Sequence, residues 1–154
     1  MSIAPALPTV FTRADAARRG FSAAQIRWRV EFGRWVRLRR GVFCTRESAT
    51  RIAADTRFRQ LVQIAAAIAA HDGPCWASHL SARRLHRLPA LHSDRDEVCL
   101  TVDPASGAFE RLGGVRILPA AVPADHQTYV GAVPTLNGPR TVVDTLRTLA
   151  LDDA

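Results

Sequence analysis

The chain has 154 residues, the size of one globular domain or of two small ones. Hydrophobic residues make up 47% and charged residues 23%, which excludes an intrinsically disordered chain. The chain contains 21 basic residues, all of them arginine, and 14 acidic residues, so its net charge is +7. The absence of lysine can reflect a genomic codon bias towards GC. In either case arginine keeps its charge at every pH and binds phosphate with two parallel hydrogen bonds.

The positive charge is concentrated in the first part of the chain. Residues 1–59 contain 13 arginines and four acidic residues, a net charge of +9, whereas residues 60–154 contain 8 arginines and 10 acidic residues, a net charge of −2. This asymmetry predicts a nucleic-acid-binding module followed by a domain with another role. Charge alone leaves open the alternative of solvated, arginine-rich helices.

Three features bear on the cellular compartment. The three cysteines are an odd number without CxxC spacing, which argues against a disulfide framework. The first ten residues contain two prolines and no basic segment, so they do not resemble a secretory signal. The longest apolar stretch, residues 61–70, is about half a membrane span. We therefore expect a cytoplasmic protein with no membrane partner.

Two capping patterns predict two short helices near the N-terminus. The first helix follows Thr12 and ends at Gly20, and the second follows Ser22 and covers about residues 23–32, with Gly33 just after its end. Two short helices separated by two residues are typical of a helix-turn-helix.

Residues 35–44 change to a period of two and predict a β-hairpin that reverses near Gly41. Val36, Leu38 and Phe43 are predicted to form the buried face of this hairpin. Arg37 and Arg39 are predicted to lie on its outward face. A helix pair followed by a basic hairpin is the order of elements in a winged helix-turn-helix.

The rest of the chain mixes helices and strands. We expect a long helix over residues 51–71, a short helix from Ser78 to before Pro89, and a last helix over 140–151. The apolar stripe of the long helix is predicted to be Phe58, Leu61, Val62, Ala65, Ile68 and Ala69. Strands are predicted over residues 98–102, 115–118 and 129–133.

The predicted fold class is therefore α+β. A winged helix-turn-helix over residues 1–50 precedes a connecting helix and a small mixed α/β domain over residues 51–154.

The second helix is the candidate DNA-recognition element, because that helix enters the major groove in a helix-turn-helix. Gln25 could contact adenine, and Arg27 or Arg29 could contact guanine or phosphate. Gln25 could instead complete the capping box with Ser22, which is the preferred alternative. Trp28 lies on the outer face, and we expect it to pack under the long helix rather than to contact DNA. Phosphate contact is predicted for the arginines on or beside the hairpin, Arg34, Arg37, Arg39 and Arg40.

Metal and catalytic sites are not expected. Cys75 and His79 are four residues apart but straddle a predicted helix start, and no second pair has ligand spacing. Adjacent Ser78 and His79 do not form a nucleophile–base arrangement, and the chain has no phosphate-binding glycine loop. Arg140 and Asp144 are interpreted as a helix-surface ion pair. We therefore expect neither an enzyme nor a cofactor.

Several runs of residues carry a resemblance to a known family. The runs 10–20, 26–27 and 33–43 resemble the N-terminal winged helix of the AbiEi antitoxin family. The blocks 77–82, 88–89, 133–134 and 140–144 resemble the second domain of its actinobacterial relatives. Together the runs extend over about residues 9–150.

The resemblance implies an antitoxin of a type IV toxin–antitoxin system linked to phage defence. Such proteins are DNA-binding repressors of their own operon, so double-stranded DNA upstream of the gene is the implied partner. They oppose a nucleotidyltransferase toxin without a stable complex. The winged helix is implied to bind DNA and the second domain to act as antitoxin. The DNA-binding positions that the resemblance transfers are Gln25, Arg27, Trp28, Arg29, Arg37, Arg39 and Arg40.

Many relatives continue into a third domain that is similar to a very-short-patch-repair endonuclease. Such a domain would start where this sequence ends, at Ala154, so we expect a stand-alone regulator or the relic of a longer gene. Two alternatives remain. The chain could be the DNA-targeting part of such an endonuclease with a separate catalytic partner, or a protein-interaction module whose basic face meets an acidic partner.

Overall fold

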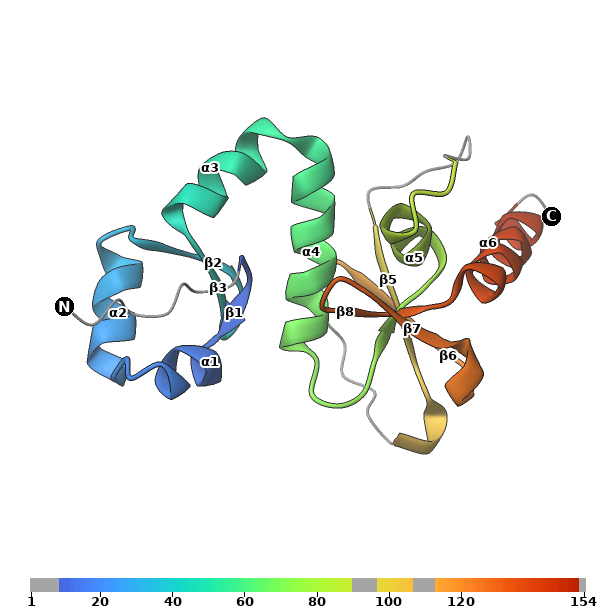
Figure 1. Cartoon of the computed structure of the whole chain (residues 1–154), viewed down its shortest axis with the longest axis horizontal. Helices are drawn as coiled ribbons and strands as arrows, with labels where there is room; N and C mark the ends of the chain where they lie inside the picture. The colour runs from blue at the N-terminus through green and yellow to red at the C-terminus, as the bar shows by residue number, and fades with distance from the viewer. Residues whose placement is uncertain (1–8, 90–96, 107–112, 153–154) are drawn as a thin grey trace. The chain divides into compact units, whose positions relative to one another are not determined.

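The structure is a computed structural model that describes residues 9–89, 97–106 and 113–152. The chain divides into two compact units, residues 1–70 and residues 71–154, and both contain helices and a sheet (Figure 1). The α+β prediction is therefore confirmed. None of the helices in the described ranges has the length and apolar character needed to cross a membrane.

The first unit is built on a three-stranded antiparallel sheet in the order β1-β3-β2 (Figure 1). Its elements in chain order are β1 (Phe11–Thr12), α1 (Arg13–Arg18), α2 (Ala23–Glu31), β2 (Trp35–Arg39), β3 (Val42–Thr45), α3 (Arg46–Ala54) and α4 (Thr56–Ala70).

Both short helices begin where the capping patterns predict. The Thr12 hydroxyl accepts the N–H of Asp15 at 3.1 Å, and the Asp15 carboxylate accepts the N–H of Thr12 at 2.8 Å. The Ser22 hydroxyl accepts the N–H of Gln25 at 3.2 Å, and the Gln25 amide oxygen accepts the N–H of Ser22 at 2.8 Å. Each box satisfies backbone donors that the first helical turn leaves unpaired. After α2 the chain turns at Gly33, whose φ is +65°.

An aromatic cluster forms the core beneath α1 and α2. Phe11 and Trp35 meet edge to face with their centroids 4.8 Å apart, and Phe21 meets Trp35 in the same way at 5.1 Å. Ring pairs with this geometry stabilise a core beyond the area that they bury. The strand β1, which sequence analysis did not predict, brings Phe11 opposite Phe43.

The predicted buried face of the hairpin is wrong at its first strand. Trp35 is 4% exposed, whereas Val36 is 36% exposed. Burial of the larger Trp35 side chain removes more apolar area from water, so Trp35 rather than Val36 faces the core. The pairing of β2 with β3 then becomes irregular between Arg37 and Arg39, which disturbs the period of two. Phe43 is buried as predicted.

The predicted long helix is two helices, α3 and α4, that meet at Asp55. Asp55 has an extended backbone, and its carboxylate accepts the N–H of Phe58 at 3.0 Å, which starts a new helix. Of the predicted apolar stripe only Val62 is buried, and its other five residues are partly buried. The remaining buried side chains of α4, which the stripe did not include, are Ile64, Ala66 and Ala67.

The helix α4 packs on all three strands of the first sheet. Residues 46–70 therefore belong to the first compact unit, and the boundary between the units lies 20 residues after the predicted one at residue 50.

The second unit contains a mixed five-stranded sheet in the order β6-β5-β4-β8-β7 (Figure 1). The pairs β5–β6 and β4–β8 are parallel, and the other two pairs are antiparallel. Its elements are β4 (Trp76–Ala77), α5 (His79–Leu85), β5 (Val98–Val102), η1 (Pro104–Ser106), β6 (Val115–Pro119), η2 (Ala124–His126), β7 (Gln127–Val130), β8 (Val133–Leu136) and α6 (Gly138–Asp152).

One predicted strand of this unit is wrong. Residues 129–133 do not form a single strand, because the chain turns at Gly131 with a φ of +61° and makes the β7–β8 hairpin. The short helix, the final helix and the strands near residues 98 and 115 are confirmed. The helices α5 and α6 pack against each other.

Candidate nucleic-acid interface

The first unit has the arrangement of a winged helix-turn-helix. The helices α1 and α2 follow each other across a short turn, and the hairpin β2–β3 follows α2. The backbone N–H of Arg13 donates to the carbonyl of Gly41 at 2.9 Å, which ties the tip of the hairpin to the start of α1. The fold thus places this unit in a class of proteins that commonly bind duplex DNA.

A hollow of about 300 Å³ lies beside α2 and the hairpin. It is lined by Arg13, Ile26, Arg27, Val30, Glu31, Arg37 and Phe43. The three arginines come from three different elements, α1, α2 and β2. Buried Ile26 and Phe43 contribute apolar surface, and Glu31 is the single acidic residue of the lining.

The three arginines of the hollow are available to an external anion. Across the described residues, no hydrogen bond or ion pair engages the side chain of Arg13, Arg27 or Arg37. Their charges are therefore concentrated without internal compensation other than Glu31 nearby. Guanidinium groups with unused donors match phosphate oxygens in geometry and charge.

The structure brings together two of the predicted DNA-binding residues, Arg27 and Arg37, and adds Arg13. Sequence analysis missed Arg13 because the capping pattern identifies it only as the first residue of a helix. Its place beside the hairpin depends on β1, a strand of two residues that is too short to leave a periodic pattern.

Arg29 lies apart from this hollow. Its guanidinium carbon is 4.8 Å from the centroid of Phe21 and 5.5 Å from that of Trp35. The Nε atom is buried and has no hydrogen-bond partner among the described residues. Arg29 therefore packs on the aromatic core of its own unit.

Gln25 and Trp28 face away from that core. Gln25 uses its amide oxygen in the capping box with Ser22, as the preferred alternative expected. Trp28 is 47% exposed and stacks on Phe32. The expectation that it packs under the long helix is wrong, because α4 lies on the sheet and Trp28 projects from the opposite side of α2 from buried Ile26.

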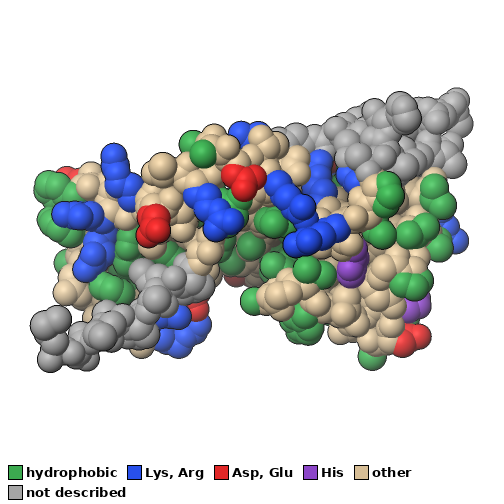
Figure 2. Space-filling view, turned by 45° about the horizontal axis from the view of Figure 1, so that its top comes forward, with side chains coloured by type: hydrophobic (Ala, Val, Ile, Leu, Met, Phe, Trp, Pro, Cys, Tyr) green, Lys and Arg blue, Asp and Glu red, His purple; other side chains and the backbone are tan. Residues whose placement is uncertain are grey.

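The remaining predicted arginines lie at the end of α2 and on the hairpin. Arg34 and Arg40 are exposed, whereas Arg39 is half-buried and burial lowers the pKa of its guanidinium group. Figure 2 shows arginine side chains beside acidic and apolar ones on the face that it presents. The unit as a whole carries 13 arginines and four acidic residues.

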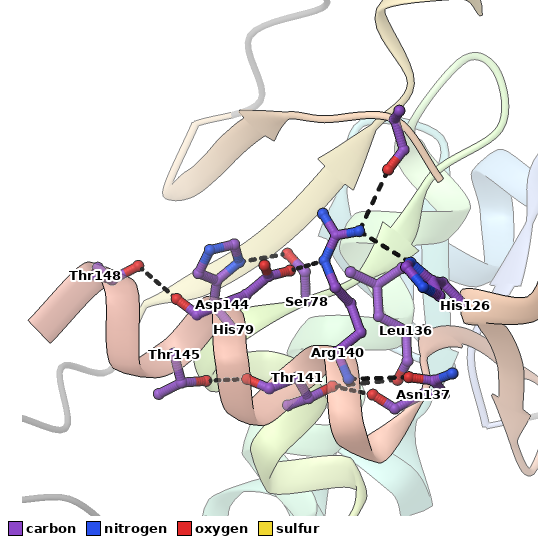
Figure 3. Close-up of polar contacts among 11 residues, drawn as sticks. Ser78, His79, His126, Leu136, Asn137, Arg140, Thr141, Asp144, Thr145 and Thr148 are labelled. Carbon is purple, nitrogen blue, oxygen red and sulfur yellow. Dashed lines mark hydrogen bonds and ion pairs between the residues drawn. The ribbon is translucent and has the colours of Figure 1, made fainter. Parts of the chain in front are cut away.

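The second unit contains a buried polar network around α6 (Figure 3). The Nε of Arg140 donates to the Asp144 carboxylate at 2.7 Å, and the same guanidinium group lies 3.1 Å from Nδ1 of His126. The side chains of Arg140 and Asp144 are 19% and 7% exposed. The ion pair is therefore mostly buried, which corrects the expectation of a surface pair.

Ser78 and His79 lie at the other side of this network (Figure 3). Their side chains are in contact, with Oγ of Ser78 3.1 Å from Nδ1 of His79. Ser78 is fully buried, so its hydroxyl is closed to a substrate. Among residues 9–89, 97–106 and 113–152, no three histidine, cysteine or acidic side chains are grouped as metal ligands.

Comparison with known proteins finds a family match, which lies within the first unit. Residues 6–46 match the family model of a transcriptional regulator, the AbiEi antitoxin, and this match ends where α3 begins. The resemblance found in the sequence is thereby confirmed for the winged helix-turn-helix, which is similar to antitoxins that act as transcriptional regulators. No curated protein matches the chain at a significant level.

Proposed function

We propose that the protein is a DNA-binding transcriptional repressor and the antitoxin of a type IV toxin–antitoxin system. In this proposal it acts in the cytoplasm, represses its own operon and contributes to phage defence. It opposes a nucleotidyltransferase toxin without forming a stable complex with it. The match of residues 6–46 to antitoxin regulators supports the class of function.

The observation that carries the DNA-binding part is the convergence of Arg13, Arg27 and Arg37 on one hollow beside α2. With α2 in the major groove, this hollow faces the sugar–phosphate backbone at the groove edge, and Arg27 and Arg37 bind phosphate oxygens. Arg34, Arg39 and Arg40 extend the contact along the backbone. These contacts fix the position of the protein without selecting a sequence.

The test measures binding of the full-length protein to duplex DNA from upstream of its gene, and to a scrambled duplex, across a salt series. Each lost phosphate contact lowers the slope of log K against log salt by about 0.9, so R27A/R37A should lower it by about two units. The variant should weaken binding to both duplexes equally. The matched control is Arg147→Ala, which removes an exposed charge from α6 in the second unit.

The proposal requires that R147A leave the slope unchanged. Normal folding of R27A/R37A with unchanged affinity and slope would show that the hollow does not contact DNA. Absence of binding to any duplex, with binding to an acidic protein, would favour the interaction-module alternative.

The antitoxin part has a separate test. A nucleotidyltransferase encoded beside this gene should inhibit the growth of cells that express it, and co-expression of this protein should restore their growth. The two proteins should not co-purify. The DNA-targeting alternative would be favoured if a nuclease gene lies in that position and this protein does not restore the growth of cells that express a nucleotidyltransferase.

A further inference from the structure

Two aromatic side chains are exposed together on the outer side of α2. The rings of Trp28 and Phe32 are 5.0 Å apart with an interplanar angle of 33°. Trp28 is 47% exposed and Phe32 62%, although Ile26 on the opposite side of the same helix is 2% exposed. The left end of Figure 2, where Figure 1 has α2, shows apolar side chains next to arginines.

The stack presents a small apolar surface in a fixed geometry. Aromatic side chains bury about 150–250 Å² each, so two half-exposed rings present roughly 200 Å². A stable protein–protein contact needs about 800 Å² on each partner. A second copy of this unit would also bring its own net charge of +9 towards the same face. Size and charge therefore favour a polyanion with apolar points of contact over a second copy of the chain.

The polar side chains on α2 that are suited to base contact have other roles. The amide oxygen of Gln25 is used in the capping box, and Arg29 is packed on Phe21 and Trp35. Arg27 lines the hollow beside the hairpin. Trp28 and Phe32 are the large apolar side chains that are exposed along the middle and at the end of α2.

We propose that Trp28 and Phe32 contact the C5-methyl groups of thymine, so that α2 selects thymine-containing sites by apolar contact. The inference rests on the proposed DNA binding and adds the residues that determine specificity. Thymine alone presents a methyl group in the major groove, and aromatic side chains make favourable apolar contact with it. The arginines of the hollow supply affinity, and the aromatic pair supplies discrimination.

The experiment removes only the methyl groups. Duplexes are selected from a random library with the full-length protein, and the best duplex is then synthesised with thymidine or with deoxyuridine. Affinity for the deoxyuridine duplex should fall about four-fold for each methyl group contacted. W28A/F32A should bind both duplexes equally. R27A/R37A is the matched control, because it should weaken binding to both duplexes and keep the preference for thymine.

Two results obtained with the wild-type protein overturn this inference alone. One is equal binding of the wild-type protein to the thymidine and deoxyuridine duplexes, and the other is selection of sites without thymine. Both use the wild-type protein, so the test does not depend on how the variants fold. If sedimentation shows that W28A/F32A turns a dimer into a monomer, the stack is a contact between copies and the inference is wrong. Absence of binding to every duplex overturns the proposed function as well.

Discussion

The guanidinium carbon of Arg29 lies 4.8 Å from the centroid of Phe21, so one arginine of α2 packs on the aromatic core of its own unit. Arg29→Ala should lower the free energy of unfolding by about 1–2 kcal/mol, because a partly desolvated cation–π contact is lost. Urea denaturation measures this loss.

Arg29→Ala should also change affinity for a selected duplex and for a scrambled one by the same factor. The matched comparison is Arg27→Ala, whose side chain lines the hollow and should lower DNA affinity without a comparable loss of stability. A selective loss of affinity for the selected duplex in a fully stable R29A protein would show that Arg29 contacts a base.

In the first unit, local sequence patterns predicted the starts of the helices but not where the side chain of Arg29 lies. The capping boxes at Thr12 and Ser22 operate within four residues, so the sequence contains everything that determines those helix starts. The place of Arg29 depends on Trp35, which reaches the core only after the hairpin has formed. Asp55 was missed as a helix start because no glycine or proline separates residues 51–55 from the apolar stripe that begins at Phe58.

In the second unit, the strand Trp76–Ala77 and the burial of the Arg140–Asp144 pair depend on contacts between residues distant in the sequence, which local patterns do not predict. Trp76–Ala77 is a central strand of two residues, held between β5 and β8, and its length is too short for a periodic pattern. The spacing of Arg140 and Asp144 predicted their ion pair, but not its burial. That burial depends on neighbours distant in the sequence, such as His126, which contacts the Arg140 guanidinium group.

Removal of one partner of the buried Arg140–Asp144 pair should strongly destabilise the second unit. Asp144→Asn or Arg140→Met leaves a largely buried charge without its partner and should lower the free energy of unfolding by about 3 kcal/mol. R140M/D144N should be less destabilised than the sum of the two single variants, because it leaves no unpaired charge. A double-mutant cycle measured by denaturation checks this, and additive losses would show that the pair is not coupled.

The cysteines should be unreactive while the protein is folded. Cys44, Cys75 and Cys99 are buried and free, and burial raises the pKa of Cys75 and of Cys99 to about 11. At neutral pH these thiols are therefore protonated as well as shielded, and the thiolate is the reactive form. Labelling with a thiol reagent should be slow in buffer and reach three groups per chain in denaturant. Rapid labelling of Cys75 or Cys99 in the folded protein would contradict their burial.

The stability of the second unit should decrease in mildly acidic solution because of His79. Burial lowers the pKa of His79 from its ordinary value of 6.5, the charge of Asp144 opposes this shift, and Arg116 and Arg140 add to it. The unfolded chain therefore takes up a proton at a pH at which the folded chain still excludes it. Unfolding then binds protons, so the free energy of unfolding rises with pH in this range. The contribution of neutral His79 to the free energy of unfolding is complete above about pH 6.5, and it is lost as the pH falls through the lower pKa of the folded state.

His79→Asn is the variant that isolates this effect, because asparagine tolerates the positive φ of 47° at this position and does not titrate. The free energy of unfolding of the wild-type protein should fall more steeply than that of H79N between about pH 7.5 and 5. The lowered pKa of Asp15 acts below its ordinary value of 3.8, outside this window, so it does not obscure the comparison. Denaturation of both proteins across the pH series measures the difference. Parallel curves would show that His79 exchanges its proton equally in the folded and unfolded chains.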